Sequence, residues 1–249
     1  MNFFQRLLGK REPILEPADL SILGTDMHSH LLPGLDDGIQ NIEETLDVIR
    51  AFVGFGYKKL ITTPHIMGDF YKNTPEQVKK ELAKLKQIVS NEGIEIELEC
   101  AAEYYVDFEF EKLVEETELL TFGNNYLLFE FSYINTPINY KSIVFQMQSK
   151  GYRPVLAHPE RYAFWYNDFA KLTELKDLNV LFQLNINSLF GYYSKPAMLV
   201  ANKLLDENMV SFIGTDTHGM RHINIIKQNL RNPMLHKAIQ APNLLNKLL

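Results

Sequence analysis

Five of the seven histidines in this chain lie at or just after the end of a short apolar segment. They are His28, His30, His65, His158 and His218. Two acidic residues, Glu103 and Glu130, lie inside segments that are apolar enough to be buried. A buried carboxylate is costly unless it is paired or binds a cation, and neutral imidazole is the commonest metal ligand in proteins. The sequence therefore predicts a metal site assembled from several separate segments.

The segment His28-Ser29-His30 is the first of two motifs that strengthen this prediction. In an extended segment alternate side chains point to the same side, so both imidazoles can reach one metal ion. An acidic turn that contains Asp36 and Asp37 follows a few residues later. A histidine pair of this kind is often incidental, but its position at the end of a predicted strand favours metal binding.

The second motif is TDTH, which supplies Asp216 and His218 at the end of another apolar segment. Asp216 has the alternative role of capping the helix that follows. His65 in TTPHI and His158 in LAHPE each have the alternative role of a packing residue. Because all four residues lie at strand ends, one shared metal site explains them better than four separate roles.

Together these segments contain nine candidate metal ligands: His28, His30, Asp37, His65, Glu103, Glu130, His158, Asp216 and His218. One zinc ion needs only three or four protein ligands, whereas nine suit a cluster of two or three ions in which a carboxylate bridges two of them. Ligation by imidazole and carboxylate without thiolate favours manganese, iron or zinc. Glu103 and Glu130 have one alternative role, as partners of buried arginines.

Two arginines, Arg161 in HPERY and Arg221 in HGMRH, follow turns that carry candidate ligands. The planar guanidinium group matches the oxygens of a phosphate group, so these side chains indicate an anionic substrate such as a phosphate ester. The alternative for each arginine is an ion pair with Glu160 or another surface acid. Aromatic residues after the same strands either line the site or pack on its rim: Tyr104, Tyr105, Tyr162, Trp165, Tyr166, Tyr192 and Tyr193.

Apolar segments of strand length alternate with longer stretches of helical periodicity, which is the pattern of βα units around a parallel sheet. We expect strands near residues 22–28, 58–64, 94–103, 126–132, 153–158, 180–186 and 210–215. In a parallel barrel the carboxyl ends of the strands converge on one face. Six of these segments would deliver a His, Asp or Glu to that face. The segment 180–186 ends in Asn185 and Asn187, whose amides we expect to hold the rim together.

Two helices are predicted most clearly, with the apolar faces Ile42, Leu46, Ile49, Val53 and Val78, Leu82, Leu85, Val89. Asn41 and Thr74 occupy the expected N-cap positions, and Pro75 lies in the first turn of the second helix. Further helices are expected near residues 107–118, 139–150, 167–178, 195–208 and 221–230, and at the C-terminal end. With 249 residues and no Gly/Ser-rich or Pro-rich linker, the chain is expected to form a single α/β domain.

The composition excludes several classes of protein. With 25 basic and 31 acidic residues the net charge is −6, which argues against a surface built to bind a nucleic-acid backbone. The single cysteine, Cys100, permits no intrachain disulfide, and we expect it to be buried by packing. No apolar stretch approaches the roughly 18 residues of a membrane span. We expect a cytoplasmic protein without a transmembrane segment.

Six motifs carry a resemblance to a known family: HSHLLPGLDDG, TTPH, AAEYY, FEFS, LAHPERY and GTDTHG. In this order they resemble the polymerase and histidinol phosphatase (PHP) family, and more narrowly its bacterial tyrosine-protein phosphatases of capsular and extracellular polysaccharide synthesis. The resemblance implies a distorted (β/α)₇ TIM-like barrel over residues 23–249 with three divalent metal ions, often manganese. Residues 1–22 form an N-terminal extension outside it, expected to be a simple lead-in, with a peripheral anchor or a partner contact as alternatives.

The resemblance also implies a role for each candidate residue. The first metal would be held by His28, His30, Glu103 and Asp216, the second by Glu103, Glu130 and His158, and the third by Asp37, His65 and His218. Arg161 and Arg221 match arginines that bind the phosphoryl group. The implied reaction is hydrolysis of phosphotyrosine on a protein, such as a bacterial tyrosine kinase, by metal-bound hydroxide. Cys100 lacks the HCX₅R setting of cysteine-dependent phosphatases.

Three alternatives remain open on the sequence. The metal ligands are shared across the wider family, so a small-molecule phosphatase acting on histidinol phosphate is the nearest alternative. A metal-dependent nuclease is disfavoured by the net charge of −6. A non-enzymatic regulator that binds a kinase is disfavoured because no ligand position is substituted.

Overall fold

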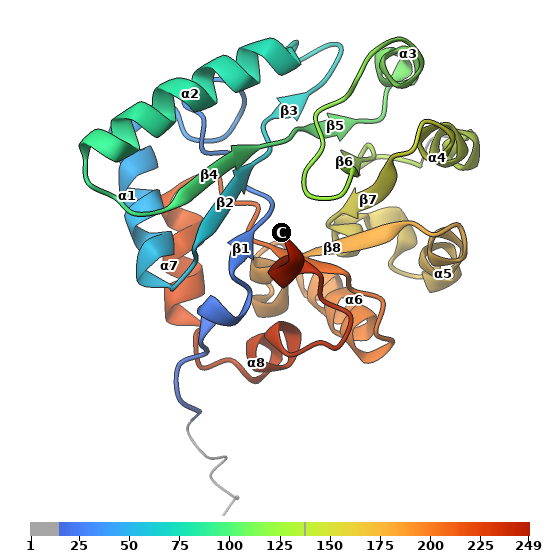
Figure 1. Ribbon diagram of the computed structural model, residues 1–249. Helices are drawn as coiled ribbons and strands as arrows, with labels where there is room; N and C mark the ends of the chain where they lie inside the picture. The colour runs from blue at the N-terminus through green and yellow to red at the C-terminus, as the bar shows by residue number, and fades with distance from the viewer. Residues whose placement is uncertain (1–14, 137) are drawn as a thin grey trace, which may run out of the picture.

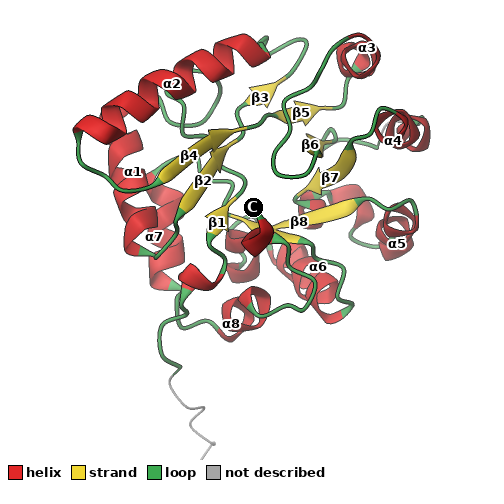
Figure 2. Cartoon of the chain, in the orientation of Figure 1, coloured by secondary structure: helices red, strands yellow, loops and turns green. Residues whose placement is uncertain are grey.

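A computed structural model describes residues 15–136 and 138–249. The described strands are β1 (Thr25–Asp26), β2 (Lys59–Thr62), β3 (His65–Ile66), β4 (Glu97–Cys100), β5 (Glu103–Tyr105), β6 (Tyr126–Glu130), β7 (Arg153–Ala157), β8 (Leu181–Asn185) and β9 (Phe212–Gly214). The α-helices are α1 (Ile42–Gly54), α2 (Pro75–Asn91), α3 (Phe108–Glu116), α4 (Tyr140–Ser149), α5 (Phe169–Asp177), α6 (Lys195–Asp206), α7 (Met220–Gln228) and α8 (Pro233–Ile239). The helices surround the strands (Figure 1; Figure 2).

All neighbouring strands pair in parallel, which confirms the predicted α/β class. They form a three-stranded sheet of order β1-β2-β4 and a six-stranded sheet of order β3-β5-β6-β7-β8-β9. The predicted strand 94–103 is two strands, because the chain leaves the first sheet after β4 and joins the second as β5. A short strand that was not predicted, β3, follows β2 in the same way after Pro64, which has no N–H to continue a ladder. These two shifts distort the TIM-like arrangement.

Hydrogen bonds beyond the ends of β1 and β9 join the two sheets at the carboxyl ends of the strands. Ser29 forms a parallel bridge with Thr217, and the His30 amide donates to the Thr217 carbonyl at 2.9 Å. On the other side of this segment, the Thr63 amide donates to the Ser29 carbonyl at 2.7 Å. The segment that carries both histidines of the HxH motif is therefore fixed on two sides by backbone hydrogen bonds.

At the amino ends of the strands, a buried side chain fills the place between β1 and β9. Asn246, in the short 3₁₀ helix Asn246–Leu248, donates to the carbonyls of Thr25 and Ile213 at 3.1 and 2.7 Å. Its Oδ1 accepts from the Ile213 amide at 2.9 Å. One amide side chain thus replaces strand pairing at this position.

The helices follow the expected pattern closely. Asn41 and Thr74 cap α1 and α2 with side-chain hydrogen bonds to Glu44 and Gln77, as predicted. All four residues of the predicted apolar face of α2 are buried. In α1 the buried face is rotated, so the prediction for Val53 is wrong: it is exposed, and Val48 and Phe52 are buried in its place. No helix in the described ranges is long and apolar enough to cross a bilayer.

The N-terminal extension is only partly described. Residues 1–14, which hold the basic cluster considered as an anchor or partner contact, lie outside the described residues. Ala18 and Leu20 are buried, and the Ala18 amide donates to the Leu230 carbonyl at 2.7 Å. The later part of the predicted extension therefore packs against the core.

Candidate metal centre

Four buried ligand atoms from separate segments lie close together at the carboxyl ends of the strands. The residues are His28, His30, Glu103 and Asp216. The Nε2 atom of His28 lies 3.0 Å from Glu103 Oε2, 3.4 Å from His30 Nε2 and 3.4 Å from Asp216 Oδ1. His30 Nε2 lies 3.3 Å from the same Glu103 oxygen and 3.4 Å from the same Asp216 oxygen. Ligands bound at about 2.0–2.1 Å around one tetrahedral ion lie ~3.3 Å apart, so these atoms have the spacing of a metal site.

A second group shares Glu103 with the first. His158 Nε2 lies 3.0 Å from Glu103 Oε1 and 3.8 Å from Glu130 Oε2. Burial would raise the pKa of Glu103, but His28 and His65 hold it well below its ordinary value. Burial and the charge of Glu103 raise the pKa of Glu130 well above its ordinary value. A cation between them would remove the repulsion that keeps Glu130 neutral.

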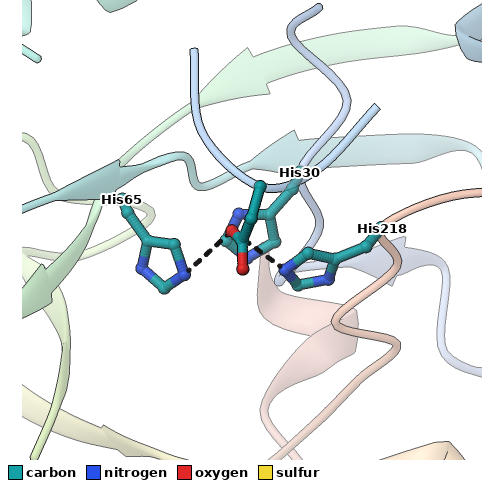
Figure 3. Close-up of side chains that lie close together, drawn as sticks. His30, His65 and His218 are labelled. Carbon is teal, nitrogen blue, oxygen red and sulfur yellow. Dashed lines mark ion pairs between the residues drawn. The ribbon is translucent and has the colours of Figure 1, made fainter. Parts of the chain in front are cut away.

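A third group lies nearer the surface. Nε2 of His65 and Nε2 of His218 each lie 3.5 Å from Asp37 Oδ1, and His30 lies beside them. Figure 3 shows His30, His65 and His218 converging from three different parts of the chain. Asp37 is the most exposed of these side chains. All nine predicted ligands thus lie in neighbouring groups, and His65 faces two of them: its Nε2 atom faces Asp37, and its Nδ1 atom faces Glu103 and Glu130.

A buried nitrogen without a partner shows that the groups fit cations. Nδ1 of His65 is buried and has no hydrogen-bond partner among residues 15–136 and 138–249. It lies 3.4 Å from Glu103 Oε2 and 3.4 Å from Glu130 Oε1. Burial lowers the pKa of His65, so the imidazole is neutral and has a lone pair available. Burying a polar atom without a partner costs free energy unless a ligand such as a metal ion binds to it.

Further side chains orient the imidazoles of His28 and His30 through contacts at their Nδ1 atoms. Asp36 Oδ2 lies 2.7 Å from Nδ1 of His30 and also accepts from the His65 amide at 2.9 Å. Gln183 Oε1 lies 2.8 Å from Nδ1 of His28, so Nε2 of each histidine is left to face the candidate ligand group. Such hydrogen bonds fix the ring orientation of a metal-binding histidine. Of the two acids in the turn, Asp36 therefore lies behind the imidazoles of His30 and His65, whereas Asp37 lies among the candidate ligands.

Strand β8 supplies amides where the other strands supply ligands. The Gln183 Nε2 group donates to Asn185 Oδ1 at 2.8 Å, and the Asn185 Nδ2 group donates to Asp216 Oδ2 at 2.8 Å. A chain of side chains thus connects His28 to Asp216. Sequence analysis placed Asn185 at the rim but missed Gln183. The available signal was a polar amide in the centre of the apolar segment VLFQLNI.

Arg161 is the one arginine of the predicted pair that lies in the site. Its Nη1 atom donates to Asp216 Oδ2 at 2.8 Å, so the alternative of an ion pair with Glu160 is wrong. Its guanidinium group lies 4.9 Å from the ring centroid of Tyr133 and 4.1 Å from that of Tyr193. Cation–π contacts with two rings restrict the orientation of the guanidinium group. Arginine therefore orients Asp216 while remaining next to the cavity.

Arg221 does not join Arg161. It is exposed, its guanidinium lies 5.3 Å from the ring centroid of Tyr192, and it does not line the cavity. Asp216 does not cap a helix, because the N-cap of α7 is Gly219. Among the described residues, neither Glu103 nor Glu130 forms an ion pair with an arginine. Two alternatives considered for the acids are therefore excluded.

Two candidate ligands have an unusual backbone conformation. His158 has φ 34° and Asp216 has φ 49°, which is the left-handed region that residues other than glycine seldom adopt. Both lie at the end of a strand, where the chain must turn sharply and still direct the side chain inward. Strain of this kind is typical of functional sites.

The cavity above the three groups has a volume of about 200 Å³. Met67, Tyr71, Tyr105 and Tyr133 line it together with Arg161 and all the candidate ligands except His28 and His30. Sequence analysis missed Tyr71 and Tyr133 as lining residues. Of the aromatic residues it named, Tyr105 lines the cavity. The side chains of Tyr104, Tyr162 and Trp165 are buried in the core instead.

A larger cavity of about 640 Å³ lies next to α2 and the segment 117–121, and it contains none of the candidate ligands. Cys100 lines it and is half-buried, so the prediction of full burial is only partly right. Burial raises the pKa of the Cys100 thiol, which is the opposite of what a nucleophilic cysteine needs.

Comparison with known proteins agrees with this geometry. A family model for capsular polysaccharide synthesis, CpsB/CapC, matches residues 24–242, a range that contains every candidate site residue. The chain is 29% identical over 204 residues to the tyrosine-protein phosphatase YwqE of Bacillus subtilis, covering 82% of this chain and 80% of YwqE. It is 23% identical over 201 residues to the tyrosine-protein phosphatase CpsB of Streptococcus pneumoniae, covering 78% of this chain and 83% of CpsB.

The fold is similar to a solved structure of the same kind of protein. A crystal structure from work on YwqE and the Streptococcus pneumoniae CpsB, described as metal-dependent tyrosine phosphatases, matches with a TM-score of 0.75 at 25% identity. The match covers 88% of this chain and 95% of that chain. The chain belongs to the CpsB/CapC family of capsular polysaccharide synthesis.

Proposed function

We propose that this protein is a metal-dependent protein-tyrosine phosphatase. Its substrate would be phosphotyrosine on a protein, and the partner a bacterial tyrosine kinase of capsular or extracellular polysaccharide synthesis. The observation that carries the proposal is the group of four ligand atoms 3.0–3.4 Å apart, with Arg161 bonded to one of the ligands. The phosphatases YwqE and CpsB support the reaction type.

Three divalent cations, with manganese preferred over iron or zinc, would occupy the three donor groups. The first would be held by His28, His30, Glu103 and Asp216, the second by Glu103, Glu130 and His158, and the third by Asp37, His65 and His218. Bound cations of this type supply an activated water at neutral pH and neutralise phosphoryl oxygens. Burial and the nearby Arg161 lower the pKa of His158 to about 4, which keeps its imidazole neutral for ligation.

The side chains of the cavity would position the substrate. Arg161 would bind phosphoryl oxygens through the N–H groups that Asp216 does not use, in the orientation fixed by the two tyrosine rings. Tyr71, Tyr105 and Tyr133 would contact the aromatic ring of the substrate. Arg221 would be a second phosphate-binding group, and its exposed side chain would have to turn from Tyr192 towards the cavity.

The test uses manganese-loaded protein and a phosphotyrosine peptide. We expect chelation to abolish phosphate release and manganese to restore it. His28→Ala and Glu103→Ala should lose both bound metal and turnover. Arg161→Ala should retain metal but lose about 10²–10³-fold in kcat, since it removes a group that stabilises phosphoryl charge. Arg50→Ala, which removes an exposed arginine on α1, is the matched control.

Three results would contradict the proposal. One is unchanged turnover in all three site variants. Another is inhibition by vanadate at the low levels that block cysteine-dependent phosphatases. The third is faster turnover of histidinol phosphate than of the peptide, which would replace the proposed substrate with a small molecule. Metal content measured on each variant separates a failure of metal binding from a failure of catalysis.

A further inference from the structure

Exposed apolar side chains are concentrated on one side of the cavity mouth. Nine large hydrophobic residues are exposed in the described part of the chain. Four of them lie in the loops that follow β3 and β6, and a fifth is the first residue of α3, directly after the loop that follows β5. These five are Phe70 (79% exposed), Phe108 (71%), Tyr133 (44%), Ile134 (86%) and Ile138 (102%). Single exposed apolar residues are ordinary, but a concentration of them indicates a binding surface.

The three loops lie side by side and are connected. Strands β3, β5 and β6 are consecutive neighbours in the six-stranded sheet. The Gly68 amide in the first loop donates to Asp107 Oδ2 in the second at 2.8 Å. The Val106 amide in the second loop donates to the carbonyl of Glu130, where the third begins, at 2.9 Å. We call Phe70, Phe108 and Ile134 the apolar rim.

Two residues of the apolar rim are next in sequence to residues that line the cavity: Phe70 precedes Tyr71, and Ile134 follows Tyr133. The same loops and the end of β5 also supply the lining residues Met67 and Tyr105. The loops after β7, β8 and β9 contain none of the nine exposed apolar residues. Trp165, the largest side chain there, is buried. Exposed apolar side chains therefore occur on only one side of the cavity mouth in the described part of the chain.

The size of the cavity explains why a substrate needs a surface outside it. Its volume of about 200 Å³ is below the ~300–1,000 Å³ of ordinary ligand pockets. A phosphorylated side chain can enter such a space, whereas the residues before and after it must lie on the surrounding surface. Exposed apolar side chains on one side give those residues a place to bind.

The charges near the apolar rim limit the kind of partner. The same loops and the first turn of α3 carry the acids Asp69, Asp107, Glu109 and Glu111 and the bases Lys72 and Lys112. Lys112 already pairs with Glu109 at 3.0 Å. An excess of acids disfavours an anionic bilayer and acidic peptides, and favours apolar segments that are neutral or basic.

We propose that the apolar rim binds the residues that flank the phosphotyrosine of a protein substrate, and that it selects segments with apolar flanking residues. This inference rests on the proposed function. Phe70 and Ile134 would contact the flanking side chains, while the phosphorylated tyrosine enters the cavity between Tyr71 and Tyr133. Selection would then reside in the loops after β3, β5 and β6, separate from the groups that bind metal and phosphate.

The test compares Phe70→Ser/Ile134→Ser with Phe145→Ser, which removes a similarly exposed phenylalanine on α4. The substrates are a phosphotyrosine peptide with leucine and valine flanks, the same peptide with glycine flanks, and p-nitrophenyl phosphate. We expect the ratio of kcat/KM for the apolar peptide to that for p-nitrophenyl phosphate to fall about tenfold in the rim variant. The ratio should not change in Phe145→Ser. Wild-type protein should prefer apolar flanks to glycine flanks.

Peptide binding is measured in parallel by fluorescence anisotropy, so the inference does not depend on turnover. Equal affinity of wild type and rim variant for the apolar peptide would overturn it. A change of oligomeric state in the rim variant with unchanged peptide affinity would show a contact between copies instead. Binding to phosphatidylglycerol vesicles lost only in the rim variant would show a membrane surface. Failure of wild type to release phosphate from any substrate would contradict the proposed function, with the anisotropy comparison still deciding the role of the rim.

Discussion

The imidazole of His28 has different surroundings at its two nitrogens. Nε2 faces Glu103 and Asp216, whereas Nδ1 lies 2.8 Å from Gln183 Oε1. Since neutral imidazole carries one proton, the amide oxygen of Gln183 selects the form with hydrogen on Nδ1 and a lone pair on Nε2. Gln183 is thus a positioning residue that prepares His28 to bind a cation.

Replacing Gln183 with leucine tests this role. The substitution keeps the apolar packing of β8 but removes the acceptor for His28 and the donor for Asn185. We expect manganese affinity to fall about 10–100-fold. Competition with a fluorescent chelator measures this affinity. Gln148→Leu, which removes an amide on α4 that donates to the Leu178 carbonyl, should leave it unchanged. Equal affinities in both variants would exclude the positioning role.

Residue type made some of these side chains easy to predict and others difficult. Glu103 and Glu130 were identifiable because a carboxylate inside an apolar segment requires an explanation. Gln183 and Tyr133 were not identified, because amides and tyrosines also occur in cores and on rims without any chemical role. Their functions follow only from distances between segments far apart in the sequence. Arg221 matches the sequence motif as well as Arg161 does, yet only Arg161 reaches the cavity.

At the scale of elements, strand β9 approaches β8 and the segment after β1 very closely. A Cβ atom at Gly214 would lie 2.8 Å from His28 Cβ and 2.8 Å from Gln183 Nε2. Real Cβ contacts are essentially never this short, so neither neighbour can keep its position. The geometry of the first ligand group therefore requires a residue without a side chain at position 214.

Gly214→Ala should destabilise the fold by about 1–3 kcal/mol, because the added methyl group overpacks the core. It should also weaken manganese binding, since His28 must move. Urea unfolding and chelator competition measure the two effects. Gly54→Ala in α1 is the matched control, because a Cβ there meets no atom within 4 Å. That control should be neutral or stabilising by up to about 1 kcal/mol. A Gly214→Ala protein as stable as the control would contradict the close approach.

The order of elements was largely predictable, but the division into two sheets was not. Hydrophobic periodicity locates the α-helices and most strands, but not β3, to within a few residues, since it reflects burial of one face. The places where the chain moves from one sheet to another, between β2 and β3 and between β4 and β5, depend on the angle between neighbouring strands. No local pattern of residues records that angle. As a result the sequence segment 94–103 looked like one long strand.

For the whole molecule, the amide of Asn246 joins β1 to β9 at the amino ends of the strands. Hydrogen bonds of Thr215 with Asp26 and of His30 with Thr217 join the same segments nearer the carboxyl ends. Asn246 makes three hydrogen bonds with Thr25 and Ile213 in place of pairing between β1 and β9. Asn246→Ala should lower the free energy of unfolding by ~3 kcal/mol or more, since each unsatisfied buried group costs about 1–3 kcal/mol. Asn243→Ala, which removes one exposed hydrogen bond to Asn208, should cost less than ~1 kcal/mol. Urea unfolding compares them, and equal losses would show that Asn246 does not join the strands.

The cavity places four carboxyl groups, those of Asp37, Glu103, Glu130 and Asp216, around one guanidinium group. Before cations bind, the charged carboxylates of Asp37, Glu103 and Asp216 repel an anionic substrate, whereas burial raises the pKa of Glu130 and keeps it neutral. Each cation that binds would reverse part of that repulsion. Affinities of two ligands that influence each other must change by the same factor. A phosphate ester would therefore raise the affinity for the cations by the same factor as the cations raise the affinity for the ester. Phosphatase activity would then depend on the metal and the substrate concentrations together. A low metal concentration would prevent turnover even when substrate is abundant.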